Sequence, residues 1–592
     1  MGSRFQYLAL GNQKDIRLVF VNQISSSGRM HCTMIPVDRF NLPSAEPGFT
    51  AISYRWGDER VKGELEMRNV YAEGEVHIAE DYCVKELPQS TLDMLLELHE
   101  TGRIRGKWFW IDYLSLDQSN VSEKSAQVKR MGTVFELAVE VLVYTGPAVP
   151  STQLAMTFWE ALERTFEAFP RRGQDGELIL YSHEELLGHT FTTWASPEWK
   201  ALQEHLTRPY FRRLWVIQEV VLAQNAIYLW GSYALSALEI ALFVDWDLRS
   251  NLSMLLYQHD SSCWFSVKMI TEVVFLRMYR TVENRDWIGV LSLVVWSCDG
   301  AYTTDPRDRI YGVLGLLYGD DICIVPNYSP ENTVYDLYTD ATKRSLATAT
   351  SFDIMYGAGI GWEQNYVGLP SWVPDFTTTF SHRPGQHLRA GIGGSDESVK
   401  PLTPHPVSGA VVQVEDDPYT EWYLSTAIEM VKTVHPAPWS DAFFNSFWRT
   451  LTFNSIASAE TELGQDSPVE YGITFANLDV VRASGIRAET VVNAASNVQR
   501  ERFLTTAMDS GSKHTVCITG SGMVVLAPRL TETADVVAVC LGARAPFVLR
   551  ATNFEKDGKK VYRFVGTGYA HELNDGIHIA ASKTALGSII LR

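Results

Sequence analysis

The sequence predicts an α/β domain at the N-terminal end of the chain, followed by a mainly helical middle region and an α+β C-terminal region. Up to about residue 235, short apolar stretches typical of buried strands alternate with stretches of helical periodicity. This alternation favours a parallel sheet with flanking helices. After about residue 510, strand-like stretches are separated by Gly, Pro and charged turns, which favours a small antiparallel sheet or barrel.

The elements of the first region can be assigned in order along the chain. Four apolar stretches are predicted to be strands: FTAISY (49–54), WFWID (108–112), EVLVYTG (140–146) and NAIYLWG (225–231). Three stretches between them have helical character: STLDMLLELHE (90–100), a segment from near Ser122 and Glu123 to Ala138, and FRRLWVIQEVVLA (211–223). We expect Ser90 or Thr91 to lie near the N-cap of the first of these helices. An insertion occupies about residues 150–205.

The remainder of the chain divides by composition. We predict domains at 1–235, 236–382 and 416–592, with a linker or mobile loop at 383–415 that is rich in Gly, Pro, His and Ser. In the middle region, Pro306 in TTDPRDRIYG indicates the start of a helix. The last region is predicted to be partly helical to about 505, including FFNSFWRTL, and then to contain four strand stretches: HTVCITGSGMVVLAP, DVVAVCLG, PFVLRA and KKVYRFVGTGY.

Composition limits the class of protein. A chain of 592 residues exceeds one ordinary core, so about two to four domains are expected. The formal charge of -19 repels phosphate backbones, which argues against a nucleic-acid partner. The seven Cys form no C-x-x-C pair, and no apolar run reaches the roughly 18 residues of a membrane span. We therefore expect a cytoplasmic protein with reduced thiols and no membrane span.

Familiar catalytic and cofactor signatures are missing from the sequence. It has no Walker A loop, no H-E-x-x-H, no G-x-S-x-G and no paired Cys/His metal spacing. The Gly-rich stretches at 357–361 and 391–394 do not fit G-x-G-x-x-G between a strand and a helix. We therefore predict neither a metal nor a bound cofactor.

Glu219 is the residue that most requires an explanation. It lies in LWVIQEVVLA, which is apolar almost all round and should be buried, and a buried carboxylate is costly unless it is paired or neutralised. One interpretation is an internal salt bridge to Arg212, two turns earlier on a continuous helix, or to another Arg. The other is a carboxylate at the rim of a cleft beside Trp215, with its pKa tuned by burial.

Polar and aromatic side chains follow the first two predicted strands. Residues 52–60, ISYRWGDER, leave the first strand, and WIDYLSLDQS places Asp112, Asp117 and Gln118 after the second. If both strands are parallel, these residues meet at the edge where α/β sheets bind ligands. Solvated loops, turn formation and helix capping explain the same residues without a ligand.

Three ordered motifs resemble the fungal HET (heterokaryon incompatibility) domain over residues 49–225. They are FTAISYRWGDE, then WFWIDYLSLDQSNVSEKSAQVKRMGTVFELAVEVLVYTG, then RPYFRRLWVIQEVVLA. DPRDRIYGVLGLL, VPNYS, LPSWVPDF, FWRTL, APFVLR and YRFVGTGYAH resemble more loosely the region that accompanies this domain. The chain has Ser115-Leu116-Asp117-Gln118 where the family has Cys-Ile-Asn-Gln, and ELNDGIH where it has Gly-Met-Asp-Gly-Glu, so neither thiol chemistry nor an acidic role is transferred there.

The HET domain is in turn similar to TIR domains, which implies a flavodoxin-like parallel sheet with flanking helices. Trp215 to Glu219 resemble the TIR Trp-Cys-x-x-Glu, whose Glu is catalytic in the TIR enzymes that cleave NAD. The resemblance implies Glu219 as the catalytic carboxylate. It also implies a set of residues that contact the substrate, NAD or a related nucleotide. They are Ser53, Tyr54, Arg55, Trp56, Gly57, Asp112, Asp117, Gln118, Arg213, Trp215 and Gln218.

The resemblance therefore implies a cytosolic effector of fungal non-self recognition and programmed cell death that acts by NAD cleavage. It also implies self-association through the TIR-like domain and an upstream non-self recognition protein as partners. The alternative is a non-enzymatic TIR-like scaffold that signals by homotypic contacts and in which Glu219 is a structural ion pair.

Overall fold

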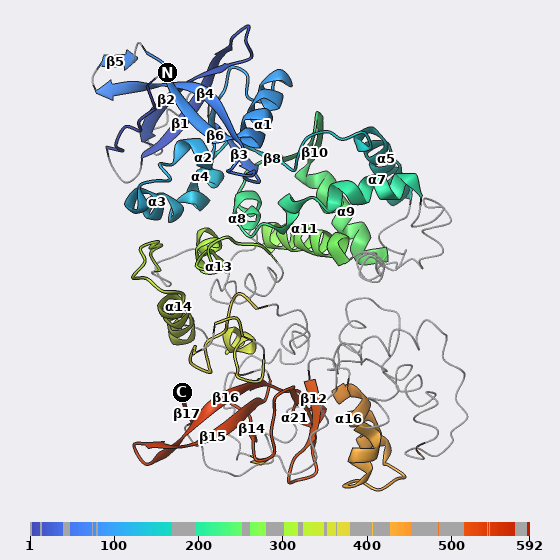
Figure 1. The fold of residues 1–592 in the computed structure, drawn as a ribbon. Helices are drawn as coiled ribbons and strands as arrows, with labels where there is room; N and C mark the ends of the chain where they lie inside the picture. Colours follow the sequence, from blue (N-terminus) through green and yellow to red (C-terminus); the bar gives the residue numbers. More distant parts are fainter. Residues whose placement is uncertain are drawn as a thin grey trace. The chain divides into compact units, whose positions relative to one another are not determined.

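The computed structural model arranges the chain in two compact units (Figure 1). One comprises Met1–Val290 and Gly300–Thr333, and the other comprises Leu291–Asp299 and Val334–Arg592. The structure describes residues 3–11, 15–38, 48–78, 81–168, 196–250, 261–279, 301–317, 324–348, 352–378, 405–406, 427–451, 484, 514–574 and 589–592, apart from residues 74, 363, 367, 541, 542 and 544. The predicted linker at 383–415 lies outside the described residues except for 405–406, as does most of the helical stretch predicted before 505.

A ten-stranded mixed sheet forms the framework of the N-terminal unit. Its strand order is β10-β9-β8-β3-β7-β1-β2-β4-β5, with β6 also paired to β4. The strands are β1 (Asp15–Ile24), β2 (Met30–Asp38), β3 (Thr50–Tyr54), β4 (Lys62–Glu73), β5 (Glu75–Ile78), β6 (Cys83–Pro88), β7 (Trp108–Trp110), β8 (Glu140–Tyr144), β9 (Ala226–Trp230) and β10 (Tyr233–Ser236).

The centre of this sheet confirms the four strands predicted from apolar stretches. β7, β3, β8 and β9 are neighbours and run parallel to one another. In chain order they occupy the positions 2-1-3-4. This is the order of the first four strands in a flavodoxin-like doubly wound sheet, which binds its ligand where the order reverses, beside the first strand.

The expectation of a purely parallel sheet is wrong outside this centre. β1 pairs antiparallel with both β7 and β2, and β4 pairs antiparallel with β5 and β6. The sequence of β4 shows why these strands are less conspicuous than the central ones. Buried Leu65 and Met67 alternate with the charged Glu64, Glu66 and Arg68, so the strand lacks a continuous apolar run.

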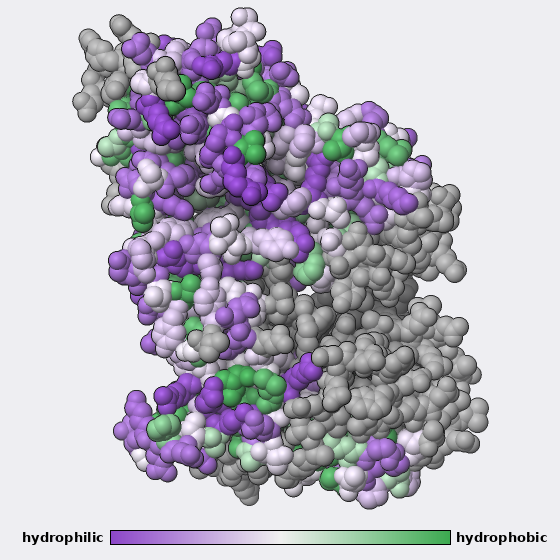
Figure 2. All heavy atoms as spheres, in the orientation of Figure 1, coloured by the Kyte–Doolittle hydropathy of each residue, from purple (hydrophilic) through white to green (hydrophobic). Residues whose placement is uncertain are grey.

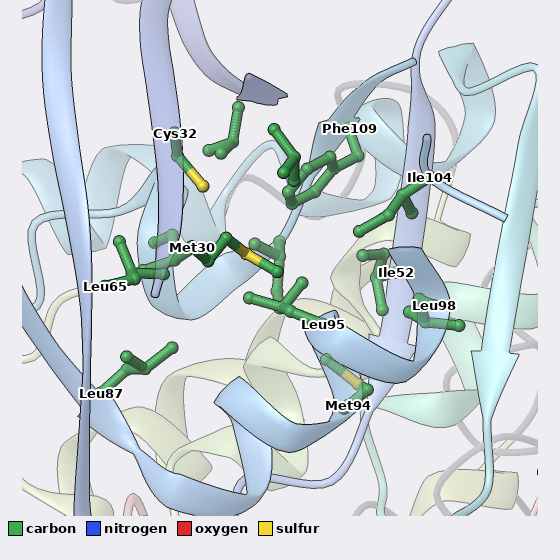
Figure 3. Packing of buried hydrophobic residues seen from close by; sticks show 14 of the residues in the cluster. Met30, Cys32, Ile52, Leu65, Leu87, Met94, Leu95, Leu98, Ile104 and Phe109 are labelled. Atoms are coloured by element: carbon green, nitrogen blue, oxygen red, sulfur yellow. The ribbon is translucent and has the colours of Figure 1, made fainter. Parts of the chain in front are cut away.

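Helices cover the sheet, and α1 (Gln89–Glu100) provides much of the core. Met94, Leu95 and Leu98 of α1 pack with Ile52 of β3 and Phe109 of β7 (Figure 3). Successive side chains of a strand point to opposite faces, so Ser53 faces away from this core. The other helical elements of this unit are α2 (Asp112–Ser115), α3 (Val121–Val128), α4 (Met131–Leu137), α5 (Thr152–Ala168), α7 (Pro197–Leu206), η1 (Pro209–Arg212), α8 (Val216–Val221), α9 (Ala237–Ser250), α11 (Ser261–Tyr279), α13 (Asp308–Tyr311) and η2 (Leu314–Leu316).

The helix boundaries correct the sequence predictions at two places. α1 starts directly after Pro88, so Ser90 and Thr91 lie in its first turn, near the N-cap as predicted. The single helix expected up to Ala138 is divided into α3 and α4. The helix expected over 211–223 is divided as well, into the 3-10 turn η1 and the short helix α8. A helix does start after Pro306, as predicted, but α13 contains only four residues.

The C-terminal unit confirms the predicted small sheet. Its strands are β11 (His405–Pro406), β12 (His514–Ile518), β13 (Val524–Pro528), β14 (Val536–Ala538), β15 (Phe547–Lys556), β16 (Lys559–Thr567) and β17 (Ile590–Leu591). A five-stranded sheet has the order β11-β14-β15-β16-β17 and is antiparallel except for the β16–β17 pair, while β12 and β13 form a separate hairpin. Asp557 and Gly558 turn the β15–β16 hairpin with positive φ at both residues, as expected for an Asp-Gly turn. The described helical elements are α14 (Val334–Thr348), η3 (Asp353–Gly357), α16 (Asp441–Leu451), which confirms the FFNSFWRTL helix, and α21 (His571–Asn574).

The surface agrees with the acidic, polar composition. On the face shown in Figure 2, the described side chains of the N-terminal unit are mainly hydrophilic, and hydrophobic residues form small separate patches. Among the helices that the structure describes, none combines the length and the apolar character needed to cross a membrane.

Candidate functional site

A chain of hydrogen bonds joins Tyr210, Ser53 and Glu219 at the centre of the candidate site. Ser53 lies near the carboxyl end of β3, and its hydroxyl donates to Oε2 of Glu219. The same Oγ lies 2.6 Å from the Tyr210 hydroxyl, which must be the donor because the Ser53 proton is already used. All three side chains are buried, and Glu219 is only 2% exposed. The structure therefore holds a carboxylate at the edge where parallel α/β sheets bind ligands.

Arg213 and Asp112 complete the charged part of the site. Nη1 and Nη2 of Arg213 each lie 3.4 Å from a carboxylate oxygen of Glu219. Asp112 lies two residues after the end of β7, at the start of α2. The charges of Glu219 and Asp112 both attract Arg213. Trp56 donates from Nε1 to Oδ2 of Asp112 at 2.7 Å. One guanidinium thus serves two carboxylates, so the cluster has one negative charge in excess when both are ionised.

Burial controls the pKa values in this cluster. It raises the pKa of Glu219, and the Arg213 charge and the Ser53 hydrogen bond oppose this rise without cancelling it. It raises the pKa of Asp112 as well, against the Arg213 charge and the hydrogen bond from Trp56. Burial alone would lower the pKa of Arg213, but the charges of Glu219 and Asp112 outweigh it and raise that pKa. Carboxyl groups with raised pKa at a strand end are typical of functional sites.

The local backbone decides which arginine meets Glu219. After η1 the chain becomes extended at Arg213, with φ −81° and ψ 133°, and α8 starts only at Val216. The predicted internal salt bridge of Glu219 to an arginine is present, but because the helix is not continuous the partner is Arg213 rather than Arg212. The guanidinium of Arg212 lies instead over the rings of Phe265 and Tyr302, at 5.1 and 4.4 Å from their centroids.

In the segment from the end of β3 into the following loop, Tyr54 and Trp56 reach the site and Arg55 does not. Tyr54 is buried, and burial followed by the Asp112 charge raises its pKa well above the usual value. Trp56 contacts Asp112 as described and packs edge-on against Tyr113, with ring centroids 5.2 Å apart. Arg55 is exposed, and no hydrogen bond or ion pair is found for it among the described residues.

Gly57 has a packing role in the same loop. A Cβ atom added to Gly57 would lie 2.9 Å from Cβ of Ser90, at the start of α1. The loop can therefore approach α1 this closely only with glycine at this position.

Four other predicted site residues form contacts of their own. Asp117 accepts hydrogen bonds from the amide and hydroxyl of Ser119, as a turn-forming residue does. Gln118 donates to the main-chain oxygen of Asp112 at 3.2 Å. Gln218 accepts from the amide of Gly315, 3.2 Å away. Trp215 donates from Nε1 to Asp308 at 3.3 Å.

Two residues of this region were missed by sequence reasoning. Tyr210 lies within RPYFRRLW, part of the third HET-like motif, but nothing in the local pattern assigns a role to its hydroxyl. Asp308 comes 93 positions after its partner Trp215, and no local pattern could have joined them. Within the described parts of the chain, no group of three or more His, Cys, Asp or Glu residues could hold a metal ion.

The geometry defines a class of protein: an α/β domain with a buried carboxylate–arginine cluster at the carboxyl edge of its parallel strands. Residues 49–219 match the family model described as heterokaryon incompatibility protein (HET), so this segment, which ends at Glu219, is a HET domain.

The chain is similar to the heterokaryon incompatibility protein 6, OR allele, of Neurospora crassa, with 23% identity over 400 residues. The alignment covers 56% of this chain and 54% of that protein, so the chain matches about half the length of its relative. No solved structure matches the chain.

Proposed function

We propose that this chain acts in heterokaryon-incompatibility-type cell death and that its HET domain cleaves NAD, with Glu219 as the catalytic carboxylate. The observation that carries the proposal is the buried Glu219, with its raised pKa, at the carboxyl end of β3. The biological role is supported by the family match and by the name of the Neurospora relative. The 2-1-3-4 strand order and the W-x-x-Q-E resemblance support the TIR-like assignment and therefore NAD as the substrate.

The groups at this site suit cleavage of a cationic nucleotide. When the bond between nicotinamide and ribose C1′ breaks, its electron pair goes to the ring nitrogen and nicotinamide leaves as a neutral molecule. The positive charge passes to an oxocarbenium-like ribose, which water then attacks with loss of a proton. Ionised Glu219 would stabilise that charge in a site from which water is largely excluded. Trp56, which is half-buried beside Asp112, could stack on a ring of the substrate.

A second buried ion pair in this unit, Arg17–Glu123, provides a comparison. Arg17 contacts both carboxylate oxygens of Glu123, at 2.5 and 3.0 Å. Its guanidinium also donates to the main-chain oxygens of Ser115 and Leu8. Arg213, by comparison, meets Glu219 at 3.4 Å with both nitrogens. The Arg213–Glu219 pair is therefore the longer of the two, and a long buried ion pair adds little stability.

The alternative is a TIR-like scaffold that acts by homotypic assembly. It is favoured by the near-complete burial of Glu219, both of whose oxygens have partners within the chain. Here Glu219→Gln would leave Arg213 without its charge partner and reduce stability by about 3 to 5 kcal/mol. In either case we propose self-association through the HET domain and an upstream non-self recognition protein as partners.

The test measures nicotinamide release from NAD by the full chain at high protein concentration. Glu219→Gln is expected to lower turnover by roughly 100-fold or more, with a melting temperature close to wild type. Glu140→Gln is the matched control, since Glu140 also accepts from a β3 hydroxyl and pairs with a cation, at the other end of the strand. It should retain turnover within about twofold. Equal cleavage by wild type and Glu219→Gln would refute the assignment, and a folded wild type without any release would favour the scaffold.

The pH profile gives an independent check on Glu219. The ionised carboxylate is the active form, and its pKa is raised by burial. The value of kcat/KM for NAD should therefore increase with pH through a transition above the usual glutamate range. A flat profile across that range would contradict an essential, ionised Glu219.

A further inference from the structure

The helix that carries Glu219 is too short to fix its own position. α8 comprises six residues, and helices of this length are marginal without tertiary contacts. Its contacts therefore decide where the Glu219 carboxylate lies. Several of the closest come from residues that follow the HET match, which ends at 219, but belong to the same compact unit.

Asp308 holds the N-terminal end of α8. Its Oδ2 accepts from Nε1 of Trp215, the residue that precedes the helix, and its Oδ1 accepts from the Tyr328 hydroxyl at 2.6 Å. The amide of Tyr328 donates in turn to Ser125 of α3 at 3.3 Å. Asp308 is 9% exposed, so its acceptor oxygens are directed at protein groups rather than at bulk water. The amide of Glu219 donates to the Trp215 main-chain oxygen, one turn from this anchor.

Arg277 of α11 holds the other end of the same helix. Its Nη1 donates to the main-chain oxygens of Val220 and Ala223, both at 2.7 Å, and its Nη2 donates to that of Gln224 at 2.9 Å. Val220 lies in the last turn of α8, where carbonyls have no partners within the helix, and Ala223 and Gln224 follow the helix. A cation at this position also interacts favourably with the helix dipole.

The segment from 301 to 317 contacts Arg213 of the central ion pair and Gln218, the residue before Glu219. Tyr302 forms a parallel bridge with Arg213, and its main-chain oxygen accepts from the Leu214 amide at 3.2 Å. Gly315 donates to Gln218, the neighbour of Glu219. Gly315 can come this close to Gln218 because it packs on Gly132 of α4. A Cβ atom added to Gly132 would lie 2.8 Å from Cα of Gly315.

We propose that Asp308 and Arg277 are positioning residues that clamp α8 from its two ends and thereby hold Glu219 against Ser53 and Arg213. The proposal rests on the proposed function, because it concerns the residue assigned there as catalytic. It adds that the site is completed by residues beyond the matched HET segment. The DPRDRIYG stretch then supports the site through Asp308.

The first test follows hydrogen exchange of α8 by mass spectrometry in the full chain. Asp308→Ala and Arg277→Ala should each accelerate exchange in peptides covering 216–222 by roughly tenfold or more, while β3 and β8 exchange as in wild type. Arg208→Ala is the matched control, since Arg208 binds the main-chain oxygens of Gly146 and Pro147 in the turn after β8. It should leave 216–222 unchanged. Unaltered exchange in both clamp variants would overturn the proposal, as would equal acceleration of all three regions, which indicates global destabilisation.

The second test uses NAD turnover. Each clamp variant should lower kcat by roughly 10- to 100-fold and change KM by less than about threefold, because Glu219 is displaced rather than removed. Arg277→Lys and Asp308→Asn keep part of the hydrogen bonding and should recover part of the lost kcat. Unchanged kcat with accelerated exchange at 216–222 would overturn the positioning role. If wild type releases no nicotinamide, the proposed function fails, while the exchange test still decides whether the clamp exists.

Discussion

The two ends of strand β3 carry the same arrangement of groups in different surroundings. At the amino end, Thr50 donates to Glu140, which also pairs with Lys107 at 2.7 Å. At the carboxyl end, Ser53 donates to Glu219, which pairs with Arg213 at 3.4 Å. The side chains of Lys107 and Glu140 are 45% and 18% exposed, whereas those of Arg213 and Glu219 are 16% and 3% exposed.

Burial, rather than the choice of partners, therefore distinguishes the two ends. A partly exposed pair contributes little to stability and costs little to form. A buried pair carries a large desolvation cost, which is repaid only by close contacts that satisfy every donor and acceptor. At the carboxyl end the ion pair is long, although Ser53 donates a hydrogen bond to Glu219, and Asp112 is a second carboxylate beside the same arginine. The carboxyl end therefore carries the larger electrostatic cost of the two.

Removal of the cation should give the largest difference between the two ends. Arg213→Met leaves Glu219 buried without a charge partner, with an expected loss of about 3 to 5 kcal/mol of unfolding free energy at pH 7. Lys107→Met leaves Glu140 with access to water and should cost less than about 1 kcal/mol. Urea unfolding of both variants, followed by circular dichroism, measures the difference. Equal losses would show that the two pairs are energetically equivalent.

Removal of the hydroxyl should have the next largest effect. Ser53→Ala takes away a hydrogen bond to a buried carboxylate and is expected to cost about 1.5 to 3 kcal/mol. Thr50→Val keeps the shape of the side chain and should cost less than about 1.5 kcal/mol, since water can replace the bond to Glu140. The same unfolding measurement applies. A larger loss of unfolding free energy for Thr50→Val than for Ser53→Ala would show that the hydroxyl matters more at the amino end of β3.

The pH dependence of stability gives a third test of the carboxyl end. The folded-state pKa of Glu219 is raised, so its stabilising contribution is complete below the unfolded value of about 4.5 and is lost as pH rises through the folded value. Glu219→Gln should therefore become more stable relative to wild type as pH is raised from 5 to 7. Melting temperatures at both pH values, with Glu140→Gln as the control, test this. A relative loss of stability at pH 7 would mean that the Arg213 attraction exceeds the cost of burial.

The sequence predicts this sheet where its strands are continuously apolar and fails where they alternate. FTAISY, WFWID, EVLVYTG and NAIYLWG are recognisable because both faces of these strands are covered. The charged residues that alternate with Leu65 and Met67 in β4 conceal a strand whose period-2 pattern is nevertheless present. The parallel centre was therefore predicted, and the antiparallel extension was not.

The candidate site could be predicted as far as its residues come from strand ends. Ser53 and Asp112 follow directly from the parallel sheet, and the burial of Glu219 follows from its apolar neighbours. The partner arginine could not be assigned, because the extended backbone at Arg213 depends on its bridge to Tyr302, about 90 residues later. The clamp by Asp308 and Arg277 is equally non-local, and local periodicity contains no information on it.

The smallest effect on stability, but a measurable one on binding, is expected at Arg55. This side chain is exposed just beyond the carboxyl end of β3, without a hydrogen bond or ion pair to the described residues. Arg55→Ala should change the unfolding free energy by less than about 0.5 kcal/mol. If the carboxyl end binds the diphosphate of NAD, the same change should raise KM about tenfold, as loss of one charge-assisted contact does, with kcat nearly unchanged. An unaltered KM would place the diphosphate away from Arg55 and would limit the binding site to the buried groups around Glu219.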